Sequence, residues 1–263
     1  MPPEETARND ETARQIAEQG YAVVRAAVPA DVVALVRETC LEDRDRRVEP
    51  FELEADTHYP GSPESADSPG GLTIRRLLWA HARGPVFTRL LTDPAVAGPL
   101  RAYFGRPVVC PLSHHNCVMT KEPAFSSDTG WHQDVRYWSF ERTDLVSAWF
   151  ALGPERPENG GLRVVPGSHA TAFDRGRFDE HLFFREDLPE NAALLETAVY
   201  PELEAGDLLL FHARTLHAAG RNRTDAVKMA AVFTFRPDDN PPVPGSRSAE
   251  MPEVLLPAAD APV

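Results

Sequence analysis

The sequence predicts a mainly β fold, a barrel or jelly roll, that lies in its second half and is flanked by helices. Apolar, β-branched and aromatic residues, typical of buried strands, fill the short segments 144–152, 162–165, 208–212 and 227–235. Turn-forming residues stand between them, at 158–161 (Glu-Asn-Gly-Gly), 166–169 (Pro-Gly-Ser-His) and 205–207 (Ala-Gly-Asp). Short strands joined by such turns favour a barrel over alternating strands and helices.

The first 104 residues are expected to be a mostly helical support for that core. Helical patterns occupy 11–19, a segment that opens at Pro29 and Asp31, and two stretches separated by Asp93-Pro94; a short strand is expected at 21–24. Gly20 is a good signal for the end of the first helix. Val32, Leu35 and Val36 form an apolar stripe on the second helix, which we expect to face the core.

The remaining segments complete a single domain over 1–263. Residues 44–75 contain several prolines and glycines and read as too polar and broken for regular structure, so they are a candidate lid, or else a plain surface loop. Residues 105–236 form the predicted jelly-roll core, and 108–119 reads as one apolar strand of it. Residues 237–263 are a proline-rich tail expected to wrap the surface or fray.

His132 and Asp134 are the strongest candidates for a functional site. If their segment is a strand, the period of two turns both side chains to one face, and His217 offers a second imidazole. Two histidines and one carboxylate suit a ferrous ion with open positions for other ligands. The pair alone is weak evidence, since nine histidines and 40 acidic residues produce such a spacing by chance.

The order of motifs gives the pair more weight. Trp-His-Gln-Asp at 131–134 is followed by Tyr-Trp, Glu-Asn-Gly, Pro-Gly-Ser-His, Gly-Asp-Leu-Leu-Leu-Phe-His and a distal histidine before Asn-Arg-Thr-Asp at 222–225. This order resembles the phytanoyl-CoA dioxygenase family over roughly residues 12 to 236. The resemblance implies a double-stranded β-helix, Fe(II), 2-oxoglutarate and O2 as cofactor and co-substrates, and His132, Asp134 and His217 as iron ligands.

Other histidines compete for the distal position. His114, His115, His169 and His212 are further candidate ligands, and His212 lies only five positions before His217. His217 is favoured because a Gly- and Asn-containing turn follows it at the family spacing, whereas His212 is still within a predicted strand.

The co-substrate site departs from the family pattern. Relatives usually place an arginine about eleven residues beyond the distal histidine, to bind the distal carboxylate of 2-oxoglutarate, and here that position is Lys228. A lysine keeps the charge but loses the bidentate fork. Either Lys228 makes a single ion pair, or Arg221 or Arg223 replaces it, or the co-substrate is not 2-oxoglutarate. We favour Lys228, which opens the strand 227–235.

Further residues are candidates for contacts inside the cavity. Asn116 and Thr120 are expected to hydrogen-bond 2-oxoglutarate and Trp149 to pack beside it, although each is equally well explained as an ordinary structural residue. Trp138, Arg136 and Gln133 are candidate substrate contacts, with solvated surface as the alternative for the arginine.

Composition limits the classes of partner. The net charge of −13 argues against nucleic acid and against an anionic membrane surface, and no apolar run suggests a membrane span or signal peptide. Three cysteines without a Cys-x-x-Cys pair favour free thiols in a cytoplasmic protein. We expect a monomer or homodimer that acts on a small molecule.

The expected reaction is hydroxylation of a small metabolite or natural-product intermediate, with release of succinate and CO2. Related halogenases have a small residue in place of the carboxylate ligand, so Asp134 favours hydroxylation over halogenation. Epimerisation, desaturation or cyclisation by the same iron chemistry is the first alternative. A non-catalytic cupin-like metal-binding or sensor protein is the second.

Overall fold

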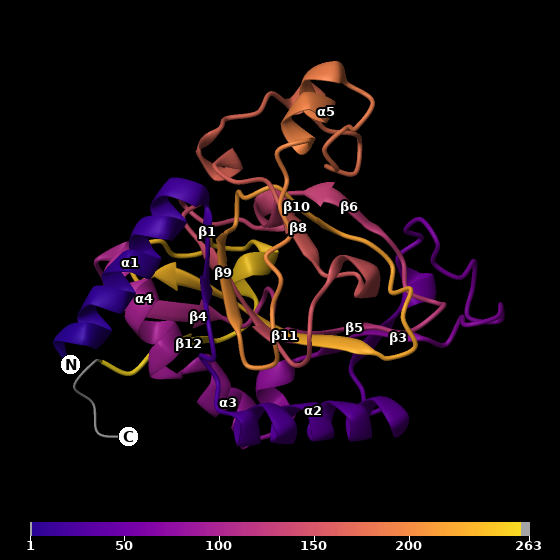
Figure 1. Cartoon of the computed structure of the whole chain (residues 1–263), viewed down its shortest axis with the longest axis horizontal. Coiled ribbons are helices and arrows are strands. Elements are labelled where there is room, and N and C mark those ends of the chain that lie inside the picture. Colours follow the sequence, from indigo (N-terminus) through magenta and orange to yellow (C-terminus); the bar gives the residue numbers. More distant parts are fainter. Residues whose placement is uncertain (1, 259–263) are drawn as a thin grey trace.

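The computed structural model describes residues 2–258, and its centre is a nine-stranded antiparallel sheet (Figure 1). The main path of this sheet runs β1 (Tyr21–Val24), β9 (Leu208–His212), β7 (Val146–Ala151), β11 (Lys228–Pro237), β5 (Cys117–Lys121), β3 (Ile74–Leu78) and β2 (Phe51–Leu53). At the far end of β11, β4 (Val108–Pro111) pairs with β11 and with β12 (Glu253–Leu255).

A second sheet of three strands faces the first. It consists of β6 (Thr129–His132), β10 (His217–Ala219) and β8 (Leu162–Val164), again antiparallel. Leu162 and Ala219 from this sheet pack against Trp149, Phe211 and Val232 from the large one. Two facing antiparallel sheets form the predicted jelly roll.

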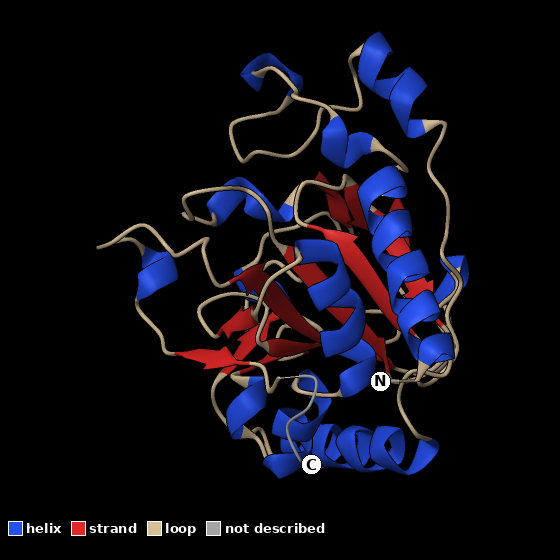
Figure 2. Cartoon of the chain, turned by 90° about the vertical axis from the view of Figure 1, so that its left-hand side faces the viewer, coloured by secondary structure: helices blue, strands red, loops and turns tan. Residues whose placement is uncertain are grey.

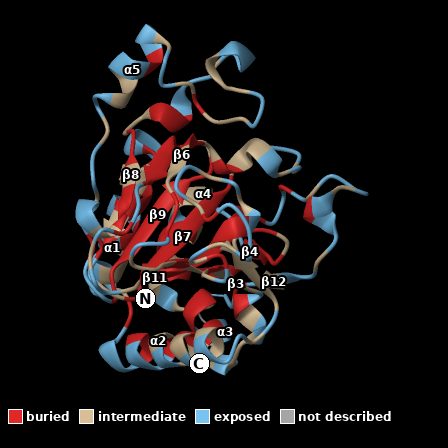
Figure 3. Ribbon diagram, turned by 90° about the vertical axis from the view of Figure 1, so that its right-hand side faces the viewer, coloured by how far each residue is buried: buried red, intermediate tan, exposed pale blue. Residues whose placement is uncertain are grey.

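Helices cover the outer face of the large sheet. They are α1 (Pro3–Gln19), α2 (Ala30–Asp45), α3 (Pro85–Leu91) and α4 (Pro94–Phe104); in Figure 2, α1 stands in front of the strands and α2 lies along the bottom, below them. Strand residues alternate between this helical core and the space between the sheets: Phe150 and Phe233 face the helices, whereas Trp149 and Val232 face inward. β7, β9 and β11 are buried along their whole length (Figure 3), and burial of both faces explains why most of their residues are apolar.

An excursion over residues 170–200, which includes α5 (Pro189–Leu195), covers the outer face of the small sheet. Phe184 packs there with Trp131 and Leu216, and the excursion stands above the sheets in Figure 1. Short 3-10 helices complete the fold: η1 (Glu54–Asp56), η2 (Ala80–Ala82), η3 (Asp134–Tyr137), η4 (Pro157–Asn159), η5 (Ser168–Ala170), η6 (Arg175–Arg177) and η7 (Arg247–Ala249).

The expected helices form, with two corrections. α1 begins at Pro3 rather than at residue 11 and ends at Gly20, whose φ of +80° closes the helix. Leu35 is 51% exposed, so the predicted apolar stripe of α2 was wrong at this position. Val33 is buried instead, because the helix turns this flank toward α3 and the sheet.

Two strand predictions need correction. The apolar run 108–119 is divided between β4 and β5 by a turn at 112–116, because the chain passes from one end of β11 to the other. The candidate lid 44–75 is not irregular throughout. Its ends form β2, η1 and β3, and only 57–73 is an extended loop, at the right of Figure 1.

The tail is more ordered than predicted. β12 pairs with β4, and Leu256 is buried in the helical core. The end of the predicted tail, 259–263, lies outside the described residues. Residues 2–258 contain no helix with the length and hydropathy of a membrane span.

Candidate metal centre

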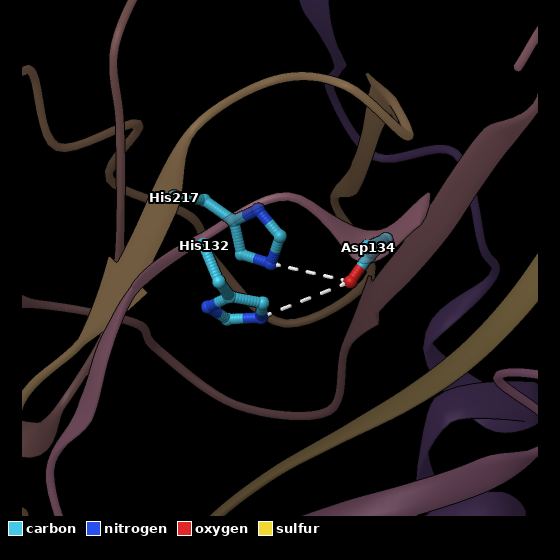
Figure 4. Close-up of side chains that lie close together, drawn as sticks. All are labelled: His132, Asp134 and His217. Carbon is cyan, nitrogen blue, oxygen red and sulfur yellow. Dashed lines mark ion pairs between the residues drawn. The ribbon is translucent and has the colours of Figure 1, made fainter. Parts of the chain in front are cut away.

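His132, Asp134 and His217 lie together on the wall of one cavity, with their side chains directed toward one another (Figure 4). His132 ends β6 and His217 begins β10, and the two are direct cross-strand partners. Nε2 of His217 lies 3.5 Å and Nε2 of His132 lies 3.9 Å from Oδ1 of Asp134. One ligand atom from each residue falls within 4.8 Å of the others, so the three could hold one metal ion.

Asp134 reaches this position in a way that the sequence did not suggest. β6 ends at His132, and Asp134 is the first residue of η3, so the strand period does not align the two side chains. The sharp 3-10 turn instead returns the carboxylate toward both imidazoles. The spacing was informative, but the inferred strand geometry was wrong.

Backbone and hydroxyl groups orient all three side chains. Nδ1 of His132 donates to the carbonyl of Gly130 at 2.8 Å, and Nδ1 of His217 donates to the carbonyl of Thr215 at 3.0 Å. Each Nε2 is thereby left with a lone pair toward the centre. The hydroxyl of Ser147 on β7 donates to Oδ2 of Asp134 at 2.9 Å, which leaves Oδ1 facing the histidines.

The electrostatics keep His132 neutral. Burial, followed by the neighbouring His217 and Arg136, holds the pKa of His132 well below its usual range. A neutral imidazole is the form that binds a metal. Two imidazoles and one carboxylate with an open side fit a ferrous ion.

The centre opens into a cavity of about 730 Å³, within the usual range for small-molecule sites. Charged side chains are numerous along its wall: Glu52, Glu54, Arg75, Arg76, Lys121, Asp134, Arg136, Lys228, Arg247 and Glu250. Arginines and lysines outnumber acidic groups along this wall, although the whole chain carries a charge of −13. The cavity wall therefore suits anionic ligands.

Comparison with known proteins gives this arrangement its family. The family model of phytanoyl-CoA dioxygenase (PhyH) matches residues 16–230. The chain belongs to the PhyH family. Among curated relatives, the ectoine dioxygenases of Stutzerimonas stutzeri and Sphingopyxis alaskensis are 26% and 27% identical, over 84% and 87% of this chain and 74% and 77% of their own lengths.

Solved structures agree with this placement. EctD from S. alaskensis with 2-oxoglutarate and 5-hydroxyectoine is 25% identical, with a TM-score of 0.70, and the match covers 95% of this chain and 85% of that one. The 2-oxoglutarate-dependent epimerase SnoN from nogalamycin biosynthesis is 25% identical, with a TM-score of 0.68 over 88% and 84% of the two chains. The chain is a 2-oxoglutarate-dependent non-haem iron dioxygenase with the double-stranded β-helix of this PhyH group.

In this PhyH site, Lys228 points into the cavity as expected but is already paired. Its Nζ lies 3.1 Å from Oε2 of Glu155 and 4.8 Å from the centre of the Trp149 ring, and Trp149 Nε1 donates to Oε1 of Glu155 at 2.7 Å. The Lys228 and Glu155 side chains are both 1% exposed. The sequence reasoning missed Glu155. A lysine on a buried strand is expected to have a buried acidic partner. No residue near Lys228 in the sequence indicated which acid this is.

The other proposed co-substrate contacts are engaged elsewhere. Asn116 Oδ1 accepts from the backbone N–H of His81, and its Nδ2 donates to the carbonyl of Leu112. Thr120 donates to the carbonyl of Ile74. Both residues line the cavity, yet these hydrogen bonds support the strand and turn around it.

Four of the residues considered as alternatives lie apart from the centre: Arg221, Arg223, His169 and His212. Arg221 pairs with Asp128 at 2.9 Å, and Arg221 and Arg223 line a separate surface pocket. His212 accepts from the backbone N–H of Arg214 and lies beside His169 rather than beside His132. The geometry therefore groups His217, and not His212, with the His132–Asp134 pair.

The predicted substrate contacts divide into two groups. Arg136 lies over the Phe183 ring, and its Nη1 is buried with no hydrogen-bond partner in the described part of the chain. Trp138 stacks on His114 and lines the cavity with Arg136. Gln133 does not line it, because its amide donates to the carbonyl of Arg214.

His115, one of the histidines considered as a further ligand, is a direct neighbour of the centre. Its Nε2 lies 3.5 Å from Oδ1 of Asp134, and its Nδ1 lies 3.3 Å from the hydroxyl of Ser147. Its backbone φ of +36° is unusual for a residue with a side chain, and Trp138 packs edge-on against its ring. Such strain is common at functional sites.

Proposed function

We propose that this PhyH-family enzyme hydroxylates a small metabolite or natural-product intermediate. In the balanced reaction, 2-oxoglutarate, O2 and a substrate C–H bond give succinate, CO2 and a C–OH group. The observation that carries the proposal is the intact set of His132, Asp134 and His217 on the wall of a cavity large enough for small molecules. Asp134 retains the carboxylate whose presence favours hydroxylation over halogenation.

Each residue of the centre has a defined part in this proposal. His132 and His217 bind Fe(II) through Nε2, and Asp134 binds it through Oδ1, while Ser147 fixes the carboxylate. Bound Fe(II) supplies the coupling of O2 reduction to oxidation of 2-oxoglutarate and substrate. The open face of the triad turns toward the cavity, so both organic molecules approach from that side.

The cavity wall divides between the two organic molecules. At the inner end, Lys228 binds the distal carboxylate of 2-oxoglutarate, and Trp149 packs beside it. At the outer end, Arg136 and Trp138 contact substrate, and the unpartnered Nη1 of Arg136 favours a substrate with an oxygenated or anionic group. Asn116 and Thr120 contribute the shape of the wall.

The loop 57–73 supplies Tyr59, which lines the cavity and lies 3.4 Å from Nη2 of Arg136. We propose that this loop acts as a lid over the substrate, within a single catalytic domain. We also propose a cytoplasmic protein, because all three cysteines of the chain lie in its described part and are free and buried.

Epimerisation or cyclisation is the second candidate reaction. The likeness to the epimerase SnoN favours it, and the same triad serves either outcome because both begin with removal of a hydrogen atom from a substrate C–H bond. Cyclisation completes a two-electron oxidation of the substrate, whereas epimerisation leaves the substrate unoxidised and requires two electrons from an added reductant such as ascorbate. Family membership sets aside the interpretation as a non-catalytic cupin-like sensor.

The decisive experiment loads the protein with Fe(II) and 2-oxoglutarate without oxygen. A weak visible charge-transfer band is expected for the chelate, followed by succinate when oxygen and candidate substrates are added. Mass spectrometry then separates the reactions: hydroxylation adds one oxygen atom, epimerisation leaves the mass unchanged and cyclisation removes two hydrogens. Absence of both the band and succinate would contradict the proposal.

A further inference from the structure

The chain contains only two lysines, and both lie in the active-site cavity. The other 25 of its 27 basic residues are arginines. Lys121 on β5 and Lys228 on β11 are direct cross-strand partners, and both line the cavity. Like charges placed directly opposite on neighbouring strands repel each other. Such a pair is favourable only if an anion offsets it.

Glu155 offsets one lysine and not the other. It pairs with Lys228, and both side chains are almost completely buried. Nζ of Lys121 donates to the carbonyl of Ser127 at 2.7 Å, and no carboxylate of residues 2–258 forms an ion pair with it. The nearby acid Glu54 is occupied by the N–H and hydroxyl of Ser127. Lys121 therefore carries the uncompensated charge.

The Glu155 carboxylate limits what Lys228 can do alone. A distal carboxylate that approached Lys228 would also meet Glu155, and the two anions would repel each other. Lys121, directly opposite Lys228, can supply the balancing charge. It also adds a second donor point, which a lone lysine lacks in comparison with the two-pronged guanidinium that relatives usually have here.

We propose that Lys121 and Lys228 together bind the distal carboxylate of 2-oxoglutarate, with Glu155 and Trp149 holding Lys228 in place. This inference rests on the proposed function. It assigns the net positive charge of the co-substrate site to Lys121, which does not stand at the position where relatives usually have their arginine. Lys121 binds the co-substrate, whereas Glu155 is a positioning residue.

The surroundings of Lys121 provide an independent readout. Burial, and then the charge of Lys228, lower the pKa of Lys121 to about 7. Arg75 on β3 acts in the same direction, and Glu54 on η1 and Asp128 before β6 oppose it. A carboxylate placed beside the ammonium favours its protonated form, so co-substrate binding should raise this pKa.

The two-lysine composition makes this shift directly observable. Protein labelled with 13C only at lysine, and loaded with Zn(II) to prevent turnover, should give two side-chain signals. We expect one of them to titrate near neutral pH and to titrate at least about one pH unit higher with 2-oxoglutarate, equivalent to about tenfold tighter binding to the protonated form. Lys121→Arg should remove this signal.

Calorimetry with the same Zn(II) protein completes the test. Lys121→Met should weaken 2-oxoglutarate binding by about ten- to a hundredfold, whereas Lys121→Arg should retain binding and identify any loss due to misfolding. If 2-oxoglutarate binds but the Lys121 signal does not move, or Lys121→Met binds as wild type, the inference fails and the proposed function stands. If wild type binds no 2-oxoglutarate, both fail.

Discussion

The two ends of the cavity are built in different ways. Lys121, Trp149 and Lys228 stand on β5, β7 and β11, neighbouring strands near the middle of the large sheet, where register fixes their positions. The outer end consists of η3, turns and the loop 57–73, with Tyr137 53% and Trp79 51% exposed. Strands hold the proposed site of the common co-substrate, and loops hold the proposed site of the substrate. Loops change more readily than central strands, so substrate choice can change without loss of co-substrate binding.

The largest expected effect on turnover comes from the metal centre, which both 2-oxoglutarate and substrate need. Asp134→Ala removes one ligand, so we expect loss of turnover and a reduced iron-to-protein ratio, measured by succinate release and metal analysis. Asp144→Asn is the matched control, because Asp144 also lies beside a histidine, His212, but outside the cavity. Equal losses in the two variants would contradict the assignment.

A stability measurement tests the inner end. Glu155→Gln leaves the buried ammonium of Lys228 unpaired, so the free energy of unfolding in denaturant should fall by about 3 kcal/mol. Added 2-oxoglutarate should stabilise this variant more than wild type, since it brings a replacement carboxylate. Glu122→Gln breaks the half-buried pair with Arg44 and should cost less than about 1 kcal/mol.

A kinetic comparison tests the outer end. Arg136→Ala should raise the Michaelis constant for substrate by about tenfold, the loss expected for one charged hydrogen bond, and leave that for 2-oxoglutarate nearly unchanged. Arg142→Ala, at a surface pair with Asp239, is the control. If Arg136→Ala raised the Michaelis constant for 2-oxoglutarate and not that for substrate, the proposed places of the two molecules in the cavity would be wrong.

The smallest effect concerns pH. The pKa of Lys121 is about 7, and only its protonated form attracts the distal carboxylate, so affinity for 2-oxoglutarate should fall by a few-fold between about pH 7 and pH 9. Lys121→Arg stays charged and should show a flatter profile over this window. If the affinity of Lys121→Arg for 2-oxoglutarate changed with pH as that of wild type does, the pH dependence would not come from Lys121.

Local patterns predicted the features that depend on neighbours in sequence. β7, β9 and β11 were expected because both of their faces are apolar, and α1 was expected to end at Gly20. His132 and Asp134 were found by spacing, although η3 rather than a strand brings them together. The turn between β4 and β5 was missed because the apolar segments on its two sides were joined into one strand, although the polar residues 113–116 interrupt them.

Features that depend on distant segments could not be predicted. Glu155 comes to Lys228 across 73 positions of chain, and Lys121 meets Lys228 only through the β5–β11 register. His115 approaches Asp134 because a strained turn places it there. In each case the residue type was visible in the sequence, but the partner was set by sheet pairing or by a turn.

The pairing of β12 with β4 has a practical consequence for handling this protein. Without β12, β4 would present a row of unpaired backbone N–H and C=O groups at the sheet edge. Loss of Leu256 would also leave a cavity in the helical core. A chain truncated before Glu253 would expose that edge to strand addition from another copy. We expect such a protein to aggregate even with an intact triad.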